Sequence, residues 1–163
     1  MEKALFAAGC FWGVQYYFDE VPGVTKTTVG YTGGHKDNPT YWEVASRKTG
    51  HAEAILIEFD PSKVSYKTLL MQFFRMHDPT QLNRQGPDVG DEYRSAIYYF
   101  NDDQKMAAEQ MIEMYNKHKS DKDGKIVTTV EEATKFYPAE EEHQKFTTKT
   151  GIGMCHIPYA PVS

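Results

Sequence analysis

The strongest constraint on the fold is an apolar run that ends at a glycine and is followed almost at once by a helix-forming stretch. Residues 4–8 suit a short buried strand, and residues 14–20 suit a helix. The sequence Gly9-Cys10-Phe11-Trp12-Gly13 fills the gap, so Cys10 is expected at a strand-to-helix turn. There the helix N-terminus favours the thiolate, the form that attacks electrophiles. A buried structural cysteine is the alternative interpretation.

Hydrophobic patterning and turn residues predict the remaining elements. We expect strands at 25–31, 52–59, 95–100 and 126–130, a helix capped by Ser65 and running through 77, and a helix from Asn101 or Asp102 to 119. Residues 32–50 and 78–93 are expected to form long polar loops, and the tail after 136 to be mostly irregular. This order predicts an α+β fold: a two-layer α/β sandwich with a ferredoxin-like split βαβ core and a mixed sheet.

Length and composition limit the classes of protein. The 163 residues lack a Pro- or Ser-rich linker, so we expect a single domain over 1–163. With 18 Lys+Arg against 23 Asp+Glu and no long apolar stretch, we expect no nucleic-acid or membrane partner, and a cytoplasmic location.

The cysteine and histidine content argues against a structural bridge and a metal site. The two cysteines, Cys10 and Cys155, lie near opposite ends, and a reducing cytosol would not keep a purely structural disulfide. No Cys-x-x-Cys pair occurs and the six histidines lack zinc-site spacing, so we expect no metal and no cofactor.

A second group of candidate residues surrounds the start of the strand at 52–59. Glu53 places a carboxylate in an apolar strand beside a long loop, although a solvated glutamate is the ordinary interpretation. Tyr41, Asp88 and Tyr93 lie in or beside the two loops, and a phenol can donate to a developing oxyanion. With eleven tyrosines in the chain, patterning alone does not select these two.

Several stretches together resemble the A class of peptide-methionine sulfoxide reductases over nearly the whole chain. They are Gly9-Cys10-Phe11-Trp12-Gly13, Gly50-His51-Ala52-Glu53-Ala54, His77-Asp78-Pro79-Thr80, Leu82-Asn83-Arg84-Gln85-Gly86, Tyr93-Arg94-Ser95-Ala96-Ile97 and Phe136-Tyr137-Pro138-Ala139-Glu140. The resemblance implies that Cys10 is the nucleophile and Glu53 the acid. It further implies that Phe11 and Trp12 form a methyl-binding pocket. The polar site residues that it implies are Tyr41, Asp88 and Tyr93.

The implied reaction fits the chemistry of these side chains. Cys10 thiolate attacks the sulfoxide sulfur, Glu53 protonates the oxygen, methionine leaves, and Cys10 becomes a sulfenic acid. Cys155 follows Gly151 and Gly153 in a tail that these glycines allow to flex, and is the expected resolving residue, through a Cys10–Cys155 disulfide that a thioredoxin-type protein reduces. Direct reduction of Cys10 by free thiols is the alternative. The S epimer, in oxidised proteins or peptides or as free methionine sulfoxide, is implied by the resemblance alone.

Two other functions use the same cysteines. A thiol peroxidase also passes through a sulfenic acid, and a redox-sensing module would use the cysteine pair only to switch a binding surface. The chain departs from the family at Glu142, where an aromatic is common before His143-Gln144, which leaves the role of this segment open. His51 and His77 are expected to be packing or loop-fixing residues rather than proton carriers.

Overall fold

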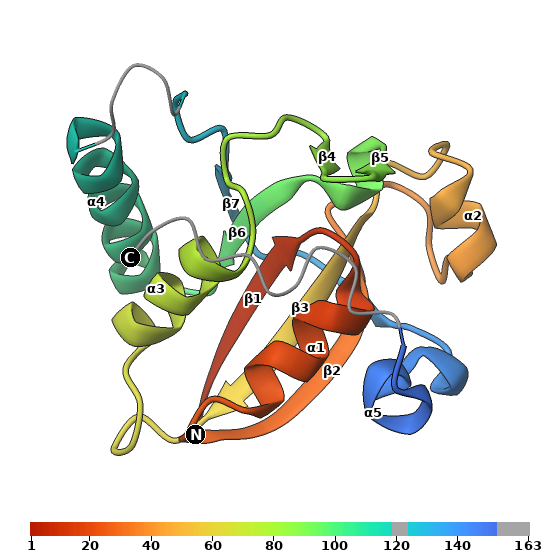
Figure 1. Ribbon diagram of the computed structural model, residues 1–163, viewed down its shortest axis with the longest axis horizontal. Coiled ribbons are helices and arrows are strands. Elements are labelled where there is room, and N and C mark those ends of the chain that lie inside the picture. The colour runs from red at the N-terminus through yellow and green to blue at the C-terminus, as the bar shows by residue number, and fades with distance from the viewer. Residues whose placement is uncertain (119–123, 153–163) are drawn as a thin grey trace.

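The computed structural model describes residues 1–118 and 124–152, in which six strands form one mixed sheet in the order β7-β6-β1-β3-β2-β8 (Figure 1). These strands are β1 (Glu2–Ala8), β2 (Val24–Thr32), β3 (Ala52–Phe59), β6 (Ser95–Tyr99), β7 (Thr129–Glu132) and β8 (Phe136–Pro138). A separate hairpin pairs β4 (Arg84–Gln85) with β5 (Asp88–Val89). The helices are α1 (Phe11–Asp19), α2 (Tyr41–Ala45), α3 (Tyr66–Met76), α4 (Asp102–His118) and α5 (Phe146–Thr150), with 3-10 turns at Asp91–Tyr93 and Glu141–His143.

The central strands have the expected split βαβ arrangement. Both β1 and β2 run antiparallel to β3, which lies between them, so β1 and β2 are parallel and α1 is the crossover that joins them. Strand β6 pairs with the free edge of β1, which gives the order β6-β1-β3-β2. The added edge strand β7 is parallel to β6 and makes the sheet mixed. The predicted α+β fold class is therefore confirmed.

The alternation of side chains along β1 explains the two layers. Ala4, Phe6 and Ala8 face the larger core, whereas Leu5 and Ala7 face a smaller cluster on the opposite side of the sheet. Figure 1 shows α1 and α3 lying across one face of the sheet. The predicted apolar stripe of α3 is fully buried there, and Ser65 caps this helix by accepting the Thr68 backbone N–H.

The structure corrects four predicted boundaries. Helix α1 begins at Phe11 rather than at 14, because a distant carboxylate accepts the Phe11 backbone N–H. The expected loop at 32–50 contains α2, which has a full capping box between Thr40 and Glu43. The strand expected at 126–130 is β7 at Thr129–Glu132, since it takes its register from β6. The tail expected to be irregular contains β8, the Glu141–His143 turn and α5.

Strand β8 brings the tail against the edge of β2 at a very close approach. A Cβ on Gly30 would lie 2.3 Å from the Tyr137 carbonyl oxygen, so glycine is required there by space alone. Pairing of Gly30 with Pro138 carries the tail on toward the N-terminus of α1. Within the described residues, no helix has the length and apolar character needed to cross a bilayer.

Candidate active site

Cys10 lies in the turn between β1 and α1, as the sequence predicts. Gly9 has a φ of +94°, a backbone angle open to glycine, and this allows the strand to turn directly into the helix. Cys10 occupies the N-cap position of α1 and is 7% exposed. Its sulfur takes part in a disulfide in this structure. The second cysteine of the sequence, Cys155, lies outside the described residues.

Glu53 on β3 is buried beside this turn. Its Oε1 accepts the Phe11 backbone N–H at 3.1 Å, so the carboxyl group contacts the residue that follows Cys10. Only 2% of Glu53 is exposed. Burial raises the pKa of Glu53 to about 8, against the lowering effect of the Phe11 N–H, and the negative charges of Glu92 and Asp88 raise it further. Glu53 can therefore hold a proton near neutral pH and donate it.

Tyr41 and Tyr93 are half-buried phenols that face the same carboxyl group. Burial raises the pKa of Tyr41 to about 12; the charge of Glu53 adds to this, and a hydrogen bond from the Tyr93 hydroxyl opposes it. Burial raises the pKa of Tyr93 as well, with further contributions from Glu53 and Tyr41. Both hydroxyls thus keep their protons at neutral pH and can donate to an oxyanion.

Two more carboxyl groups lie on this side of the site, and only one of them was expected. Asp88, on β5, has an oxygen without a hydrogen-bond partner among the described residues, and burial raises its pKa. Glu92 is 2% exposed, its pKa is raised chiefly by burial, and its Oε1 lies 3.4 Å from the Arg47 Nε. Glu92 was missed because two adjacent acidic residues, Asp91 and Glu92, in a polar loop are typical of a solvated surface.

Aromatic rings form one side of the site, and we call this set the aromatic wall: Phe11, Trp12, Tyr41, His143 and Phe146. The Trp12 ring lies nearly parallel to Phe146, with ring centroids 4.1 Å apart. His143 stacks on Tyr41 with centroids 4.4 Å apart, and its Nδ1 accepts the Trp12 Nε1–H at 3.1 Å. The wall can receive a small apolar group such as a methyl.

The tail contributes a further, partly buried contact through Glu140. One carboxylate oxygen accepts the Tyr31 hydroxyl at 3.0 Å and the other accepts the Tyr41 backbone N–H at 3.1 Å. Burial acts to raise the pKa of Glu140, but these hydrogen bonds outweigh it and lower the pKa. Glu140 therefore fixes the start of α2. Glu140 and His143 were missed as site residues, although Glu140 ends one of the recognised sequence stretches.

The structure thus brings together seven of the eight predicted site residues. Phe11, Trp12 and Tyr41 belong to the aromatic wall, whereas the carboxyl and hydroxyl groups of Glu53, Asp88 and Tyr93 face one another beside Cys10. The eighth, Cys155, lies outside the described residues.

The two flanking histidines hold loops, as predicted. His51 Nδ1 accepts the Gly34 backbone N–H at 3.0 Å, and its Nε2 lies 2.7 Å from the Lys36 carbonyl oxygen. His77 bridges the Phe73 carbonyl oxygen and the Ser95 hydroxyl.

One group of possible metal ligands occurs in the described part of the chain, and several of its donor atoms already accept hydrogen bonds. Glu140, Glu142 and His143 place one ligand atom each within 4.8 Å of one another. Both oxygens of Glu140 accept hydrogen bonds, and His143 Nδ1 accepts the Trp12 indole N–H. This cluster serves to hold side chains in place.

Comparison with known proteins gives one consistent result. A family model described as "Peptide methionine sulfoxide reductase" matches residues 2–163. A relative named "Peptide methionine sulfoxide reductase MsrA", from Methanosarcina acetivorans, is 50% identical over 156 residues, which cover 93% of this chain and 80% of that protein.

Solved structures agree in fold. Methionine sulfoxide reductase A of Corynebacterium diphtheriae is 36% identical, with a TM-score of 0.88 over 99% of this chain and 81% of that one. Mxr1 of Saccharomyces cerevisiae in its reduced form is 32% identical, with a TM-score of 0.84 over 93% of this chain and 87% of that one. Mxr1 in complex with Trx2 has a TM-score of 0.62 at 23% identity, over 88% of this chain and 84% of that one, and is similar in fold.

Proposed function

The chain belongs to the peptide methionine sulfoxide reductase family, and we propose that it reduces the S epimer of methionine sulfoxide with Cys10 as nucleophile and Glu53 as proton donor. It is an oxidoreductase that acts on methionine sulfoxide. One observation supports the proposed roles above all: the buried Glu53 carboxyl group accepts the backbone N–H of the residue next to Cys10.

The proposed step transfers oxygen from one sulfur to another. The Cys10 thiolate attacks the sulfoxide sulfur while the oxygen takes a proton from Glu53 and hydrogen bonds from Tyr41 and Tyr93. The bond between the two sulfurs and the sulfoxide S–O bond then break as the oxygen passes to the Cys10 sulfur. The sulfoxide sulfur gains the two electrons that the Cys10 sulfur loses and leaves as methionine, and Cys10 becomes a sulfenic acid. The raised pKa values of both phenols support their role as neutral donors.

The thiol and the carboxyl group need opposite protonation states. A thiolate beside Glu53 adds a negative charge, which raises the pKa of the carboxyl group further, so the two groups titrate as a coupled pair. Entry of substrate excludes the little water that still reaches Glu53 and keeps the shared proton on it.

The aromatic wall supplies the proposed pocket for the S-methyl group of the substrate. Phe11 and Trp12 bind the methyl group, while the polar groups bind the oxygen, and Asp88 orients loop groups or water near it. Asp88 has an oxygen without a partner among the described residues, which supports this role.

We assign the second half of the cycle to Cys155, which attacks the Cys10 sulfenic acid and forms a disulfide with release of water. A thioredoxin-type protein then reduces this disulfide. One fact supports a thioredoxin-type reductant: the related Mxr1 has been solved in complex with Trx2. Such a cycle suits the cytoplasm, with oxidised proteins, peptides or free methionine sulfoxide as substrates.

Single-turnover release of methionine from pre-reduced protein tests the proposal. We expect wild type to convert the S epimer of N-acetyl-methionine sulfoxide amide and to leave the R epimer unchanged, and Cys10→Ser to be inactive. Cys155→Ser should complete one turnover but lose turnover driven by thioredoxin. Faster consumption of hydrogen peroxide than of sulfoxide would instead favour a thiol peroxidase, and binding changes without methionine release would favour a redox-sensing module.

A further inference from the structure

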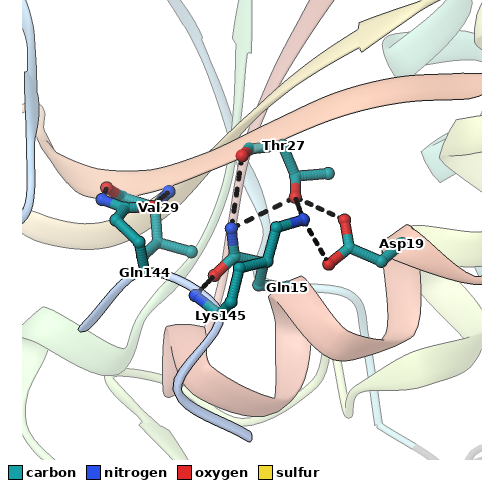
Figure 2. Close-up of polar contacts among 6 residues, drawn as sticks. All are labelled: Gln15, Asp19, Thr27, Val29, Gln144 and Lys145. Atoms are coloured by element: carbon teal, nitrogen blue, oxygen red, sulfur yellow. Dashed lines mark hydrogen bonds and ion pairs between the residues drawn. The ribbon is translucent and has the colours of Figure 1, made fainter. Parts of the chain in front are cut away.

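Four consecutive residues of the tail, His143 to Phe146, join the aromatic wall to the body of the protein, and we call them the anchored segment. His143 and Phe146 contact Trp12, whereas Gln144 and Lys145 bind β2 and α1 (Figure 2). The segment therefore places two side chains, His143 and Phe146, in the site, while Gln144 and Lys145 bind it to the rest of the protein.

Gln144 is bound by three hydrogen bonds to the backbone. Its Nε2 donates to the Val29 carbonyl oxygen at 2.8 Å and to the Ala139 carbonyl oxygen at 3.0 Å, and its Oε1 accepts the Val29 N–H at 3.0 Å (Figure 2 draws the bonds to Val29). The side-chain amide thus continues the edge of β2 just beyond the residues that pair with β8. This fixes the position of the residue next to His143.

Lys145 is held in the left-handed backbone region, with a φ of +58°. Its backbone N–H donates to the Gln15 Oε1 at 2.7 Å, and its Nζ donates to the Asp19 Oδ2 at 2.6 Å and the Thr27 Oγ1 at 3.1 Å. Gln15 is 1% exposed and itself donates to Thr27 (Figure 2). A lysine in a left-handed conformation is kept there by its surroundings, and these contacts supply them.

Trp12 depends on the opposite side of the same segment. His143 Nδ1 accepts the only hydrogen bond that the structure gives for the indole N–H within the described residues, and Phe146 covers the ring face at 4.1 Å. The accepting Nδ1 requires the neutral imidazole with its proton on Nε2. Trp12 is half-buried and also stacks with Tyr41, so these two contacts supply the part of its support that comes from the tail.

We propose that Gln144 and Lys145 are positioning residues for substrate binding, which act on Trp12 through His143 and Phe146. The inference deepens the proposed function, on which it rests, because it assumes that Trp12 receives the S-methyl group. Loss of the anchor lets the indole leave its binding orientation, which weakens binding before and during the reaction equally. Such a change raises KM and leaves kcat nearly unchanged.

Gln144→Glu is the main test, because it keeps the oxygen that accepts the Val29 N–H and removes the donor to two carbonyl oxygens. We expect KM for N-acetyl-methionine sulfoxide amide to rise about tenfold, with kcat within about twofold. Gln104→Glu is the matched control. Gln104 also accepts a backbone N–H, from Phe100, and donates to a carbonyl oxygen, of Lys3, but on α4 away from the site.

A fluorescence measurement reports on Trp12 directly and needs no activity. With Trp42→Phe as background, Trp12 is the sole tryptophan of the chain. Gln144→Glu should then shift its emission to longer wavelength and increase its quenching by acrylamide, whereas Gln104→Glu should leave both unchanged.

Rescue at His143 separates the hydrogen bond from the packing. His143→Asn can return an acceptor oxygen near the Nδ1 position, and His143→Leu cannot; both lose the stacked ring. We expect KM and Trp12 emission to be closer to wild type in the asparagine variant.

The possible outcomes separate this inference from the proposed function. Equal stability losses in Gln144→Glu and Gln104→Glu, with KM and Trp12 emission unchanged in both, would overturn the positioning role. A fall in kcat without a rise in KM would overturn it too. If pre-reduced wild type released no methionine, the proposed function would fail, and the fluorescence data would still decide whether the anchored segment holds Trp12.

Discussion

The carboxyl group of Glu53 caps helix α1 by accepting the Phe11 backbone N–H at 3.1 Å. Two influences on this carboxyl group compete there. The helix N-terminus favours its charged form, while burial favours the neutral form and dominates, which raises the pKa of Glu53 to about 8. The same contact holds the proposed proton donor against the turn that carries Cys10, so acid and nucleophile keep a fixed separation.

Removing the charge of Glu53 should change how stability depends on pH. A pKa raised from near 4.5 to about 8 means that the folded state binds the proton more tightly than the unfolded state. The contribution of Glu53 is therefore fully present below about pH 4.5 and is lost as pH rises through about 8. In urea unfolding, Glu53→Gln should become more stable than its parent by a few kcal/mol at alkaline pH.

This comparison is best made in a Cys10→Ser background, which removes the titration of the thiol. Below about pH 4.5, where Glu53 is neutral in both the folded and the unfolded state, the two proteins should differ little. A stability difference that stays constant across the pH range would contradict the raised pKa.

Removal of either phenol hydroxyl should slow the chemical step. Tyr41→Phe and Tyr93→Phe each lose a proposed donor to the sulfoxide oxygen. We expect the single-turnover rate constant to fall about 10- to 100-fold. Because the two hydroxyls are coupled, the double variant should lose less than the product of the two. Tyr98→Phe, on the other face of the sheet, is the control and should keep its rate.

Neutralising Glu92 should lower the pKa of Glu53, since the charge of Glu92 helps to raise it. The alkaline limb of kcat/KM should move to lower pH in Glu92→Gln, by roughly half a unit to one unit. Glu113→Gln serves as the comparison, because Glu113 is exposed and pairs with Lys117 on α4. An unchanged pH profile in Glu92→Gln would show that the two carboxyl groups are not coupled.

A methyl group on Gly30 should destabilise the junction between β2 and β8. Its Cβ would lie 2.3 Å from the Tyr137 carbonyl oxygen, so the strands must separate, and we expect a loss of about 3 kcal/mol. Gly86 has a φ of +55°, but a Cβ added there would meet no atom within 4 Å. The variant Gly86→Ala should therefore lose about 1 kcal/mol of stability, from backbone strain alone. Thermal or urea unfolding of both variants gives the comparison, and equal losses would refute the steric explanation.

The sequence predicted the central sheet because its signals are local. Residues 4–8 and 52–59 have the composition of buried strands, and Ser65 with its apolar stripe marks α3. The position of Cys10 at the turn followed from the same patterns. The capping box from Thr40 to Glu43 is also a local signal. Helix α2 was nevertheless missed, because the glycines and the proline of that segment predict a loop.

The rest of the site depends on contacts between distant parts of the chain. No local pattern links Tyr31 to Glu140, 109 residues later, or shows that Glu92 turns inward toward Arg47. The start of α1 at Phe11 likewise depends on Glu53, 42 residues away. The tail was expected to be irregular because its elements are short and are stabilised by β2 and α1 rather than by their own propensity.

The bond between Trp12 and His143 spans 131 positions, and this has a consequence for how the protein is made. On the ribosome Cys10 and Trp12 emerge early, whereas His143, whose imidazole binds the Trp12 indole, is synthesised 131 positions after Trp12. A nascent chain that stops short of His143 can pair its first strands, but it carries a reactive sulfur beside an indole ring that the tail does not yet hold. The wall of rings beside that sulfur is therefore complete only when nearly the whole of the described chain has been synthesised.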